Sequence, residues 1–430
     1  MLTGAALLLA AGAAAGADWP QWRGPNRSGI TSESSGFPGG WPPKLLWGRG
    51  VGAGCASPII ADGRVYVMGW QGRGTGRPRG NPIGTDTVYC LGARDGKTRW
   101  KQSYPCRYQG RFRAGDTAQY CGPLSTPAFD KATGYLYTLS VDGDLRCWDA
   151  GRGGQPVWAG NLYDTYKVRR RPDVGRGIRD YGYTGSPLVR GGVVIVEVGA
   201  DEGTVMAFDK TTGRRRWASA LTGPAGHTGG PVPLTLRGMD CLATLTLTRL
   251  VVMRADAGQE GKTLAAWPRR TDYACNIATP AVAGSQVVLT SSYNQSNTAL
   301  LEVSADGVRR KWTSRRNALV SSPVIHKGRV YVTGGSLMCL ELATGELKWR
   351  GGSFGHGSCL ITGDDRLIAF GRGRLVLLGA SGREGNYREL ARVDQVVPKT
   401  CYPHVALADG ILVCKDLAGN LACYSVRTSD

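Results

Sequence analysis

The sequence predicts an all-β protein, an eight-bladed β-propeller built from four-stranded antiparallel blades. A unit of roughly 40 residues recurs along the chain, a period typical of propeller blades. The unit is clearest in residues 321–349, SSPVIHKGRVYVTGGSLMCLELATGELKW, where four short apolar or β-branched runs alternate with turns. The composition agrees, because the chain has 64 glycines and no long stretch with helical periodicity.

Two segments are predicted to precede the propeller. Residues 1–17 are small and apolar and end in Ala-Gly-Ala, the small-x-small pattern of a signal-peptidase site, so the mature chain is expected to start at Asp18. This stretch is too short to span a membrane, which predicts an exported protein, periplasmic or extracellular, with no transmembrane segment in the mature chain. Residues 18–43 form a Trp-, Pro- and Gly-rich extension, expected to pack across one edge of the propeller.

The propeller is predicted to span residues 44–430. Residues 44–49, KLLWGR, match the fourth strand of the unit, although no first three strands precede them. From His404 onward the sequence supplies only three strands, so the N-terminal strand is expected to complete the last blade and close the ring. The seven units between these two ends are predicted to finish at Trp100, Trp158, Trp217, Trp267, Trp312, Trp349 and Tyr387.

Repeated positions separate structural residues from candidate functional ones. A tryptophan at one register of each fourth strand predicts an apolar group that docks on the neighbouring blade. One position of the third strand holds a cysteine in several blades and Ala207 in blade three, which indicates a small buried side chain rather than redox chemistry. These cysteines are Cys90, Cys147, Cys339 and Cys423.

The repeated VYxLxxxxGxxxW pattern, with Ser-Pro or Thr-Pro at the start of blades, resembles the quinoprotein-like superfamily of pyrroloquinoline quinone (PQQ) repeats. The opening DWPQWRGPNR is similar to that of secreted bacterial members. The resemblance covers nearly all of the mature chain and implies the propeller fold. Members include quinoprotein alcohol dehydrogenases and a propeller lipoprotein of the outer-membrane β-barrel assembly machinery, so the resemblance leaves an enzyme and a scaffold open.

The long loops are predicted to lie on one face of the propeller. In an up-and-down blade, the connections between blades and the loops between second and third strands emerge together. The long segments 71–86, 102–124 and 161–184 all fall on this long-loop face and are rich in arginine and tyrosine, which suits anionic ligands. A solvated basic rim is the alternative. The anion-binding candidates are Arg107, Arg111, Arg113, Arg169, Arg170, Arg171, Arg176 and Arg179.

The same face should carry the mouth of the central channel, ringed by residues that precede the innermost strands. Three of the chain's four histidines are among them, and imidazole is a common metal ligand and proton shuttle. Polar lining of a wet channel is the other interpretation, and we assign neither a metal site nor a catalytic residue. The channel-mouth ligand candidates are Cys55, Tyr183, His227, Asn276, His356, Cys401, Tyr402 and His404.

A disulfide is predicted between Cys106 and Cys121, which bracket one long loop of an exported chain. The net charge of +20 favours attraction to polyanions, but no nucleic-acid-binding motif accompanies it. The expected partner is therefore an envelope protein or an anionic polysaccharide and not a nucleic acid. The protein is expected to be a monomer.

The sequence favours a binding function over an enzymatic one. In quinoprotein dehydrogenases the quinone characteristically rests on a disulfide between adjacent cysteines, and this chain has no Cys-Cys pair and no haem-attachment CxxCH. PQQ and calcium thus lack a matching site. The prediction is an exported non-catalytic binding or scaffolding propeller that recognises an extracytoplasmic polymer or envelope protein through its basic long-loop face. The alternative is a PQQ-dependent oxidoreductase acting on alcohols or sugars.

Overall fold

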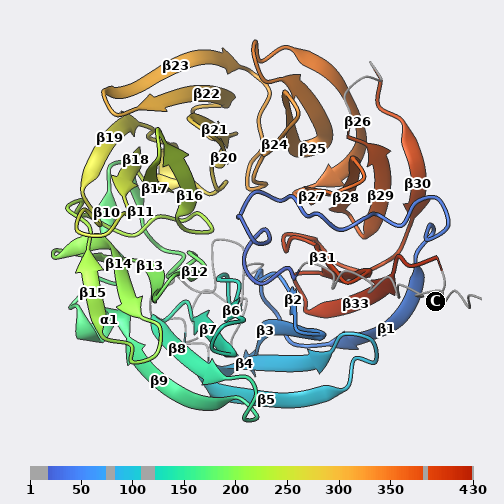
Figure 1. The fold of residues 1–430 in the computed structure, drawn as a ribbon, viewed down its shortest axis with the longest axis horizontal. Helices are drawn as coiled ribbons and strands as arrows, with labels where there is room; N and C mark the ends of the chain where they lie inside the picture. The colour runs from blue at the N-terminus through green and yellow to red at the C-terminus, as the bar shows by residue number, and fades with distance from the viewer. Residues whose placement is uncertain (1–17, 74–82, 108–121, 381–385, 429–430) are drawn as a thin grey trace, which may run out of the picture.

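The computed structural model describes residues 18–73, 83–107, 122–380 and 386–428, so the predicted signal peptide lies outside the described residues. These residues form eight antiparallel blades arranged as a closed ring around one axis (Figure 1), which confirms the predicted fold class. Among the described residues, no helix is long and apolar enough to cross a membrane.

Blades one to four each contain four strands, ordered from the axis outward as they occur in the sequence. Blade one contains β2 (Ile59–Ala61), β3 (Arg64–Arg73), β4 (Ile83–Gly92) and β5 (Thr98–Pro105), and blade two contains β6 (Ala128–Asp130), β7 (Tyr135–Leu139), β8 (Asp144–Asp149) and β9 (Gln155–Asn161). Blade three contains β12 (Leu188–Arg190), β13 (Val193–Ala200), β14 (Gly203–Asp209) and β15 (Arg215–Ala218). Blade four contains β16 (Val232–Leu236), β17 (Met239–Leu245), β18 (Arg249–Arg254) and β19 (Thr263–Pro268).

Blades five to eight follow the same order, with the ring closed as predicted. Blade five contains β20 (Ala281–Ala283), β21 (Gln286–Ser291), β22 (Asn297–Ser304) and β23 (Gly307–Ser314), and blade six contains β24 (Val324–His326), β25 (Arg329–Glu341) and β26 (Leu347–Gly355). Blade seven contains β27 (Ser358–Ile361), β28 (Arg366–Gly371), β29 (Arg374–Gly379) and β30 (Glu389–Val393). Blade eight contains β31 (Ala406–Ala408), β32 (Ile411–Lys415) and β33 (Asn420–Ser425), and is completed by β1 (Lys44–Gly50).

Two of these blades depart from a simple four-strand order. In blade six, β25 supplies both the second and third strands, because one part of it pairs with β24 and another with β26. The ion pair between Arg329 and Glu341 joins its two ends and shows that it folds back on itself. In blade eight, β1 pairs antiparallel with β33 and places Trp47 opposite Cys423. The N-terminal strand thus closes the ring and covers what would be an open sheet edge.

The predicted tryptophan docking is observed at the outer rim. The indole N–H of Trp47 donates to the Ala93 carbonyl of the next blade at 2.9 Å, and that of Trp100 donates to Ala150 at 3.1 Å. Each ring then lies against a glycine of the same turn, Gly96 or Gly154, where an added Cβ would approach the indole to 2.6 or 2.5 Å. Trp158 and Trp312 make the same pair of contacts.

The small residue of the third strand has its explanation in the strand register. Cys90 lies directly opposite Trp100 in blade one, and Ala207 lies opposite Trp217 in blade three. A larger side chain would displace the indole from the neighbouring blade. The corresponding pairs are Cys147 with Trp158, Cys339 with Trp349 and Cys423 with Trp47.

A second set of blade-to-blade contacts runs around the inner rim and uses the Ser-Pro and Thr-Pro pairs. We call it the inner belt. The residue before each proline has a hydroxyl that accepts a backbone N–H from the preceding blade. The bonds run from His404 N–H to Ser57 Oγ (2.8 Å), Ser57 N–H to Thr126 Oγ1 (3.0 Å), Thr126 N–H to Ser186 Oγ (2.9 Å), Gly229 N–H to Thr279 Oγ1 (2.8 Å) and Thr279 N–H to Ser322 Oγ (3.0 Å).

Two links of this belt, from blade three to blade four and from blade six to blade seven, use carbonyl acceptors. Ser186 N–H donates to the Gly229 carbonyl at 3.0 Å, and the Ser321 hydroxyl donates to the Gly357 carbonyl. The belt therefore links blade eight, through blades one to six, to blade seven. Because these groups are buried, each bond also satisfies a backbone donor that water cannot reach.

The first part of the N-terminal extension lies at the centre of the ring, and the rest runs outward over blades seven and eight to β1 (Figure 1). Trp19 forms a bridge with Ile60 of blade one, and Ile30 forms one with Ile361 of blade seven. Between these bridges, the Pro20 carbonyl accepts the N–H of Phe129 in blade two at 2.8 Å, and arginine side chains make further contacts with the blades. Its isolated bridges to the innermost strands explain why its sequence carries no strand pattern.

Two fully buried arginines anchor this segment. The Arg27 guanidinium donates to the carbonyls of Ser186 at 2.9 Å and Pro231 at 3.1 Å, while Arg23 donates to that of Pro323. Burial lowers the pKa of Arg27 to about 9 and that of Arg23 to about 10, because the charge loses its hydration. The carbonyl groups of three blades replace that hydration, and the guanidinium groups tie those blades together.

Replacing Gly154 by alanine should destabilise the protein more than replacing its neighbour Gly153. Both glycines have positive φ (72° and 68°), but a Cβ at Gly154 meets Trp100 at 2.5 Å and one at Gly153 meets nothing within 4 Å. Gly153→Ala should cost about 1 kcal/mol of backbone strain, and Gly154→Ala about 1–3 kcal/mol more. Urea unfolding monitored by tryptophan fluorescence measures both; equal losses would contradict the docking role of Trp100.

Removing one hydroxyl from the inner belt should also lower the free energy of unfolding. Thr126→Val keeps the side-chain volume but leaves the buried Ser57 N–H without an acceptor, at a cost of about 1–3 kcal/mol. Thr126→Ser keeps the hydroxyl and loses one methyl group, about 0.8 kcal/mol. Thermal unfolding of both variants tests whether the hydroxyl stabilises the belt. A valine variant as stable as the wild type would refute that role.

Candidate ligand-binding cavity

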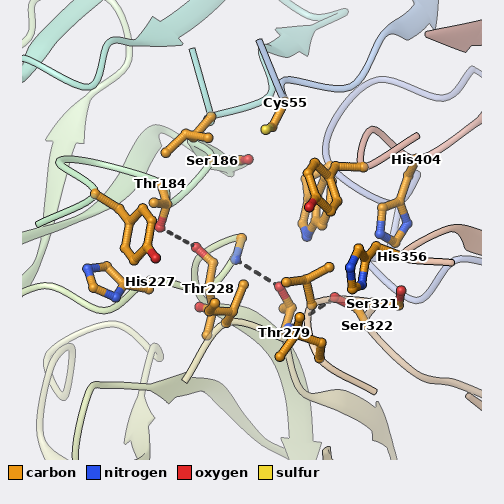
Figure 2. A pocket seen from close by; sticks show the side chains of 18 of the residues that line it. Cys55, Thr184, Ser186, His227, Thr228, Thr279, Ser321, Ser322, His356 and His404 are labelled. Carbon is orange, nitrogen blue, oxygen red and sulfur yellow. Dashed lines mark hydrogen bonds between the residues drawn. The ribbon is translucent and has the colours of Figure 1, made fainter. Parts of the chain in front are cut away.

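A cavity of about 150 Å³ lies at the centre of the long-loop face (Figure 2). All eight blades contribute to it, because the connections that lead into the innermost strands converge on the axis. The lining is formed by Trp22, Cys55, Leu124, Tyr181, Thr184, Ser186, His227, Thr228, Gly229, Ile277, Thr279, Tyr293, Leu319, Val320, Ser321, Ser322, His356, Tyr402 and His404.

The N-terminal extension closes the cavity from the opposite face. Asp18 pairs with Lys131 in a turn of that opposite face at 3.4 Å, and the chain then reaches inward to Trp22, which lines the cavity. The Trp22 ring packs on the His404 ring with a centroid distance of 4.4 Å. A ligand must therefore enter from the long-loop face, where lining residues such as Cys55, Tyr402 and His356 are only half-buried.

Aromatic and imidazole rings form much of the wall. Tyr181 meets His227 edge to face at 4.9 Å between ring centroids, and His356 stacks on Tyr402 at 5.3 Å. The second pair joins blade seven to blade eight, where the inner belt has no described bond. The His227 Nδ1 lies 3.1 Å from the Ala274 carbonyl, which orients its ring.

The cavity is electrically neutral. Its described lining contains no aspartate, glutamate, lysine or arginine. Burial, aided by the charge of Arg23, lowers the pKa of His404 to about 3, so this imidazole is uncharged at neutral pH. Burial and the nearby Arg372 also lower the pKa of His356. The ligand that suits such a site has little charge of its own, because an ion would lose its hydration without gaining a counter-ion.

Four hydroxyl groups of the lining, those of Ser186, Thr279, Ser321 and Ser322, belong to the inner belt. Ser186, Thr279 and Ser322 each accept a backbone N–H, and Thr184 donates to the Thr228 carbonyl at 2.9 Å. A hydroxyl that accepts one hydrogen bond still has an O–H to donate. The belt thus fixes the wall and leaves hydroxyl donors at the cavity.

Five of the eight channel-mouth candidates from the sequence lie in this lining, namely Cys55, His227, His356, Tyr402 and His404. The other three are used structurally. The Tyr183 hydroxyl donates to the Val198 carbonyl at 2.7 Å, and the Asn276 amide donates to Thr246 and Arg269. The Cys401 thiol is buried and accepts the Gly373 N–H at 3.3 Å.

The three histidines share the cavity, yet they do not form a metal site there. No group of three or more His, Cys, Asp or Glu side chains among the described residues could hold a metal ion. Most of the lining, including Trp22 and Tyr293, is not among the residues predicted from the sequence. Trp22 lies outside the repeating units, and only its position inside the ring brings it to the site.

The arginine candidates have different environments. Arg179 is 1% exposed and donates to Ala225, Tyr163 and Gly182 at 2.8–2.9 Å, so it supports the loop and is not available to a ligand.

Arg170 pairs with Asp164 at 2.8 Å and lies over the Tyr163 ring, and the exposed Arg169 lies 3.5 Å from Asp173. Arg171 is half-buried, Arg107 and Arg176 are exposed, and Arg111 and Arg113 lie outside the described residues.

Exposed cations nevertheless surround the neutral cavity on the long-loop face. We call them the basic rim. They come from the connections between blades and from loops between second and third strands. Its described members are Arg107, Lys167, Arg169, Arg176, Arg270, Arg315, Arg316, Arg372 and Lys399.

The predicted disulfide remains a prediction, because Cys121 lies outside the described residues. Cys106 is buried beside Asp142, with its sulfur 3.7 Å from Oδ2. The buried Asp86 lies in the same region, and burial raises the pKa of its carboxyl group to about 8. This acidic cluster lies outside the described lining of the cavity.

Comparison with known proteins assigns the chain to a family. A family model of PQQ-like repeats, described as outer membrane protein assembly factor BamB, matches residues 84–351, which is more than half of the chain. The chain belongs to the BamB family. The predicted PQQ-like propeller is thereby confirmed. No match is found among curated proteins.

Solved structures similar to this BamB-family member share its fold at low sequence identity. BamB from Moraxella catarrhalis is 15% identical, with a TM-score of 0.50 over 84% of this chain and 100% of that one. The quinohemoprotein alcohol dehydrogenase ADHIIG from Pseudomonas putida HK5 is 14% identical, with a TM-score of 0.59 over 96% of this chain and 81% of that one. Such likenesses establish the fold alone.

The cavity residues do not fit the PQQ and calcium that the quinoprotein resemblance raises. Calcium takes about six to eight oxygen ligands, with carboxylates prominent among them. The described lining offers no carboxylate and no side-chain amide, and the sequence has no adjacent cysteines to support the quinone. The site that the structure contains is one of rings and hydroxyls.

Stability should depend on pH through His404. Its pKa is about 3 when folded and near 6.5 when unfolded, so between these values the unfolded chain binds a proton that the folded chain does not. Above about pH 6.5 this difference does not lower the free energy of unfolding. As the pH drops from 6.5 towards 3, it lowers the free energy of unfolding by up to about 1.4 kcal/mol per pH unit. In His404→Phe this loss at low pH should be absent.

The comparison is made by urea unfolding of both proteins between pH 4 and pH 8. Groups common to the two proteins cancel in the difference, which isolates the imidazole. Parallel stability curves for the two proteins would show that His404 titrates normally in the folded state.

Proposed function

We propose that the protein is an exported, non-catalytic binding propeller that recognises an envelope protein through its long-loop face. The observation that carries the proposal is the neutral, ring-lined cavity inside the basic rim, on the face where all long segments emerge. Membership of the BamB family supports the envelope as the place of action, because BamB is described as an outer membrane protein assembly factor.

The construction of this face supports binding. The inner belt and the docked tryptophans hold the blades in one arrangement, so the loops project from a fixed base. Interfaces commonly combine aromatic side chains and arginine, the two kinds of residue that this face presents. The Ser186 and Ser322 hydroxyls of the cavity are already held by backbone groups, which suits a wall more than a nucleophile.

We also propose the division of the chain made from its sequence: a signal peptide in residues 1–17, the extension in residues 18–43 and the propeller in residues 44–430. The anchoring of the extension by Arg23 and Arg27 supports its retention in the mature protein. N-terminal sequencing of the secreted protein should begin at Asp18.

Site-directed photo-crosslinking in the producing cells tests the proposed function. A photoreactive phenylalanine at Arg176, an exposed residue of the basic rim, should give an adduct with one envelope protein, identified by mass spectrometry. The same group at Arg237, exposed in a turn of the opposite face, is the matched control and should give none. Equal adducts from both positions, or none from Arg176, would contradict the proposal.

An anionic polysaccharide is the other partner that the basic rim suits, and heparin retention distinguishes it. If the partner is a polysaccharide, Arg176→Gln with Arg270→Gln should elute from heparin at lower salt than Arg152→Gln with Arg237→Gln. Both pairs remove the same charge, but the second pair lies on the opposite face. That result, without a protein adduct from Arg176, would favour the polysaccharide and overturn the protein partner.

A further inference from the structure

We propose that the central cavity receives one uncharged aromatic side chain, best a tyrosine, carried by an acidic segment of the bound protein. The acidic segment and its protein rest on the proposed function. The preference of the cavity for an uncharged aromatic ring rests on the cavity alone. Four properties of the site lead to this inference.

The first property is size. The cavity measures about 150 Å³ and is closed by Trp22, so it holds a single side chain and cannot pass a polymer through the ring. Apolar cavities of about 150 Å³ accept one benzene-sized ring. A chain lying over the long-loop face can therefore insert one residue.

The second property is the wall. Tyr181, Tyr402 and His356 are half-buried rings of the lining, and Trp22 packs on the buried ring of His404. Aromatic pairs in stacked or edge-to-face geometry gain energy beyond that of area burial. The existing pairs, at 4.4 to 5.3 Å between centroids, show tilted, edge-to-face and stacked orientations that an inserted ring can extend. An aliphatic side chain would gain only from burial.

The third property is charge. The described lining has no charged side chain, and the low pKa of His404 keeps its imidazole neutral. The basic rim surrounds this neutral centre with exposed arginines such as Arg176, Arg270 and Arg372. The complementary ligand is neutral at its tip and acidic on both sides, where carboxylates can pair with guanidinium groups.

The fourth property distinguishes tyrosine from phenylalanine. Ser186, Thr279 and Ser322 use a lone pair to accept a backbone N–H and keep an O–H to donate. A phenolic oxygen accepts such a bond, whereas the edge of a phenylalanine ring leaves these hydroxyls unsatisfied. The cavity thus suits a ring with a polar tip.

Calorimetric titration of the full mature protein tests the inference with a set of short peptides. Acetyl-Glu-Glu-Tyr-Glu-Glu-amide should bind at least tenfold more tightly than the same peptide with alanine or leucine at the centre. It should also bind at least tenfold more tightly than a tyrosine peptide flanked by lysines. p-Cresol, which is the tyrosine side chain alone, should bind saturably, and 4-hydroxybenzoate, which is charged, should bind more weakly.

Two variants locate the binding. Leu319→Trp places a large ring in the cavity at a lining position outside the inner belt, and it should abolish p-cresol binding. Leu45→Trp makes the same substitution on the outer strand β1, where the side chain is 56% exposed, and should bind like the wild type. Thermal unfolding confirms that both variants fold. Tyr402→Ala, which removes one wall ring, should weaken p-cresol binding several-fold and serves if Leu319→Trp does not fold.

The outcomes separate this inference from the proposed function. Absence of p-cresol binding, together with equal affinities of the tyrosine and alanine peptides, would overturn the aromatic site even if Arg176 crosslinks to an envelope protein. Binding of p-cresol that Leu319→Trp abolishes supports the site, and a failed crosslink would then overturn the protein partner alone. Tighter binding of lysine-flanked peptides would overturn the role assigned to the basic rim.

Discussion

The hydrogen bonds of the inner belt are the constraint on which the centre of this protein depends. In five of the eight blades, a backbone N–H beside the innermost strand is held by a hydroxyl from the next blade, as Ser57 is held by Thr126 and Thr126 by Ser186. These bonds set the spacing of the strands around the axis and so the width of the cavity. They also explain why the residue before the proline is serine or threonine: the position needs a side-chain acceptor short enough to reach a neighbouring backbone.

Neighbouring blades are joined by different contacts at the outer rim and at the inner rim of the ring. At the outer rim, an indole such as Trp100 covers a glycine and donates to a carbonyl of the next blade, so one residue provides both burial and a hydrogen bond. At the inner rim, where strands converge, small hydroxyl groups of serine and threonine join the blades instead. The N-terminal segment fills the remaining space, with Arg27 supplying donors to carbonyls that point toward the axis.

This arrangement places a neutral site within a strongly basic protein. The chain has a net charge of +20, whereas the cavity wall is rich in rings and hydroxyls and its described lining has no charged side chain. Burial keeps His404 uncharged, and the buried guanidinium of Arg23 reinforces that effect. Long-range attraction and short-range selection are thereby separated: the basic rim acts over a distance on an acidic partner, and the cavity selects for shape and neutrality at contact.

The sequence by itself determined the propeller, its eight blades and its closure by residues 44–49, because the same pattern of strands, turns and docking residues recurs in each unit. It also identified the connections that lead to the axis, and hence Cys55, His227 and His404. Only the tertiary structure decided that Arg179 is buried, that Tyr183 and Asn276 support loops, and that Trp22 reaches the cavity. These outcomes depend on contacts between residues far apart in the chain, which no repeat pattern records. The extension makes the reason plain, since its arginines are bound by carbonyls about 160 to 300 residues away.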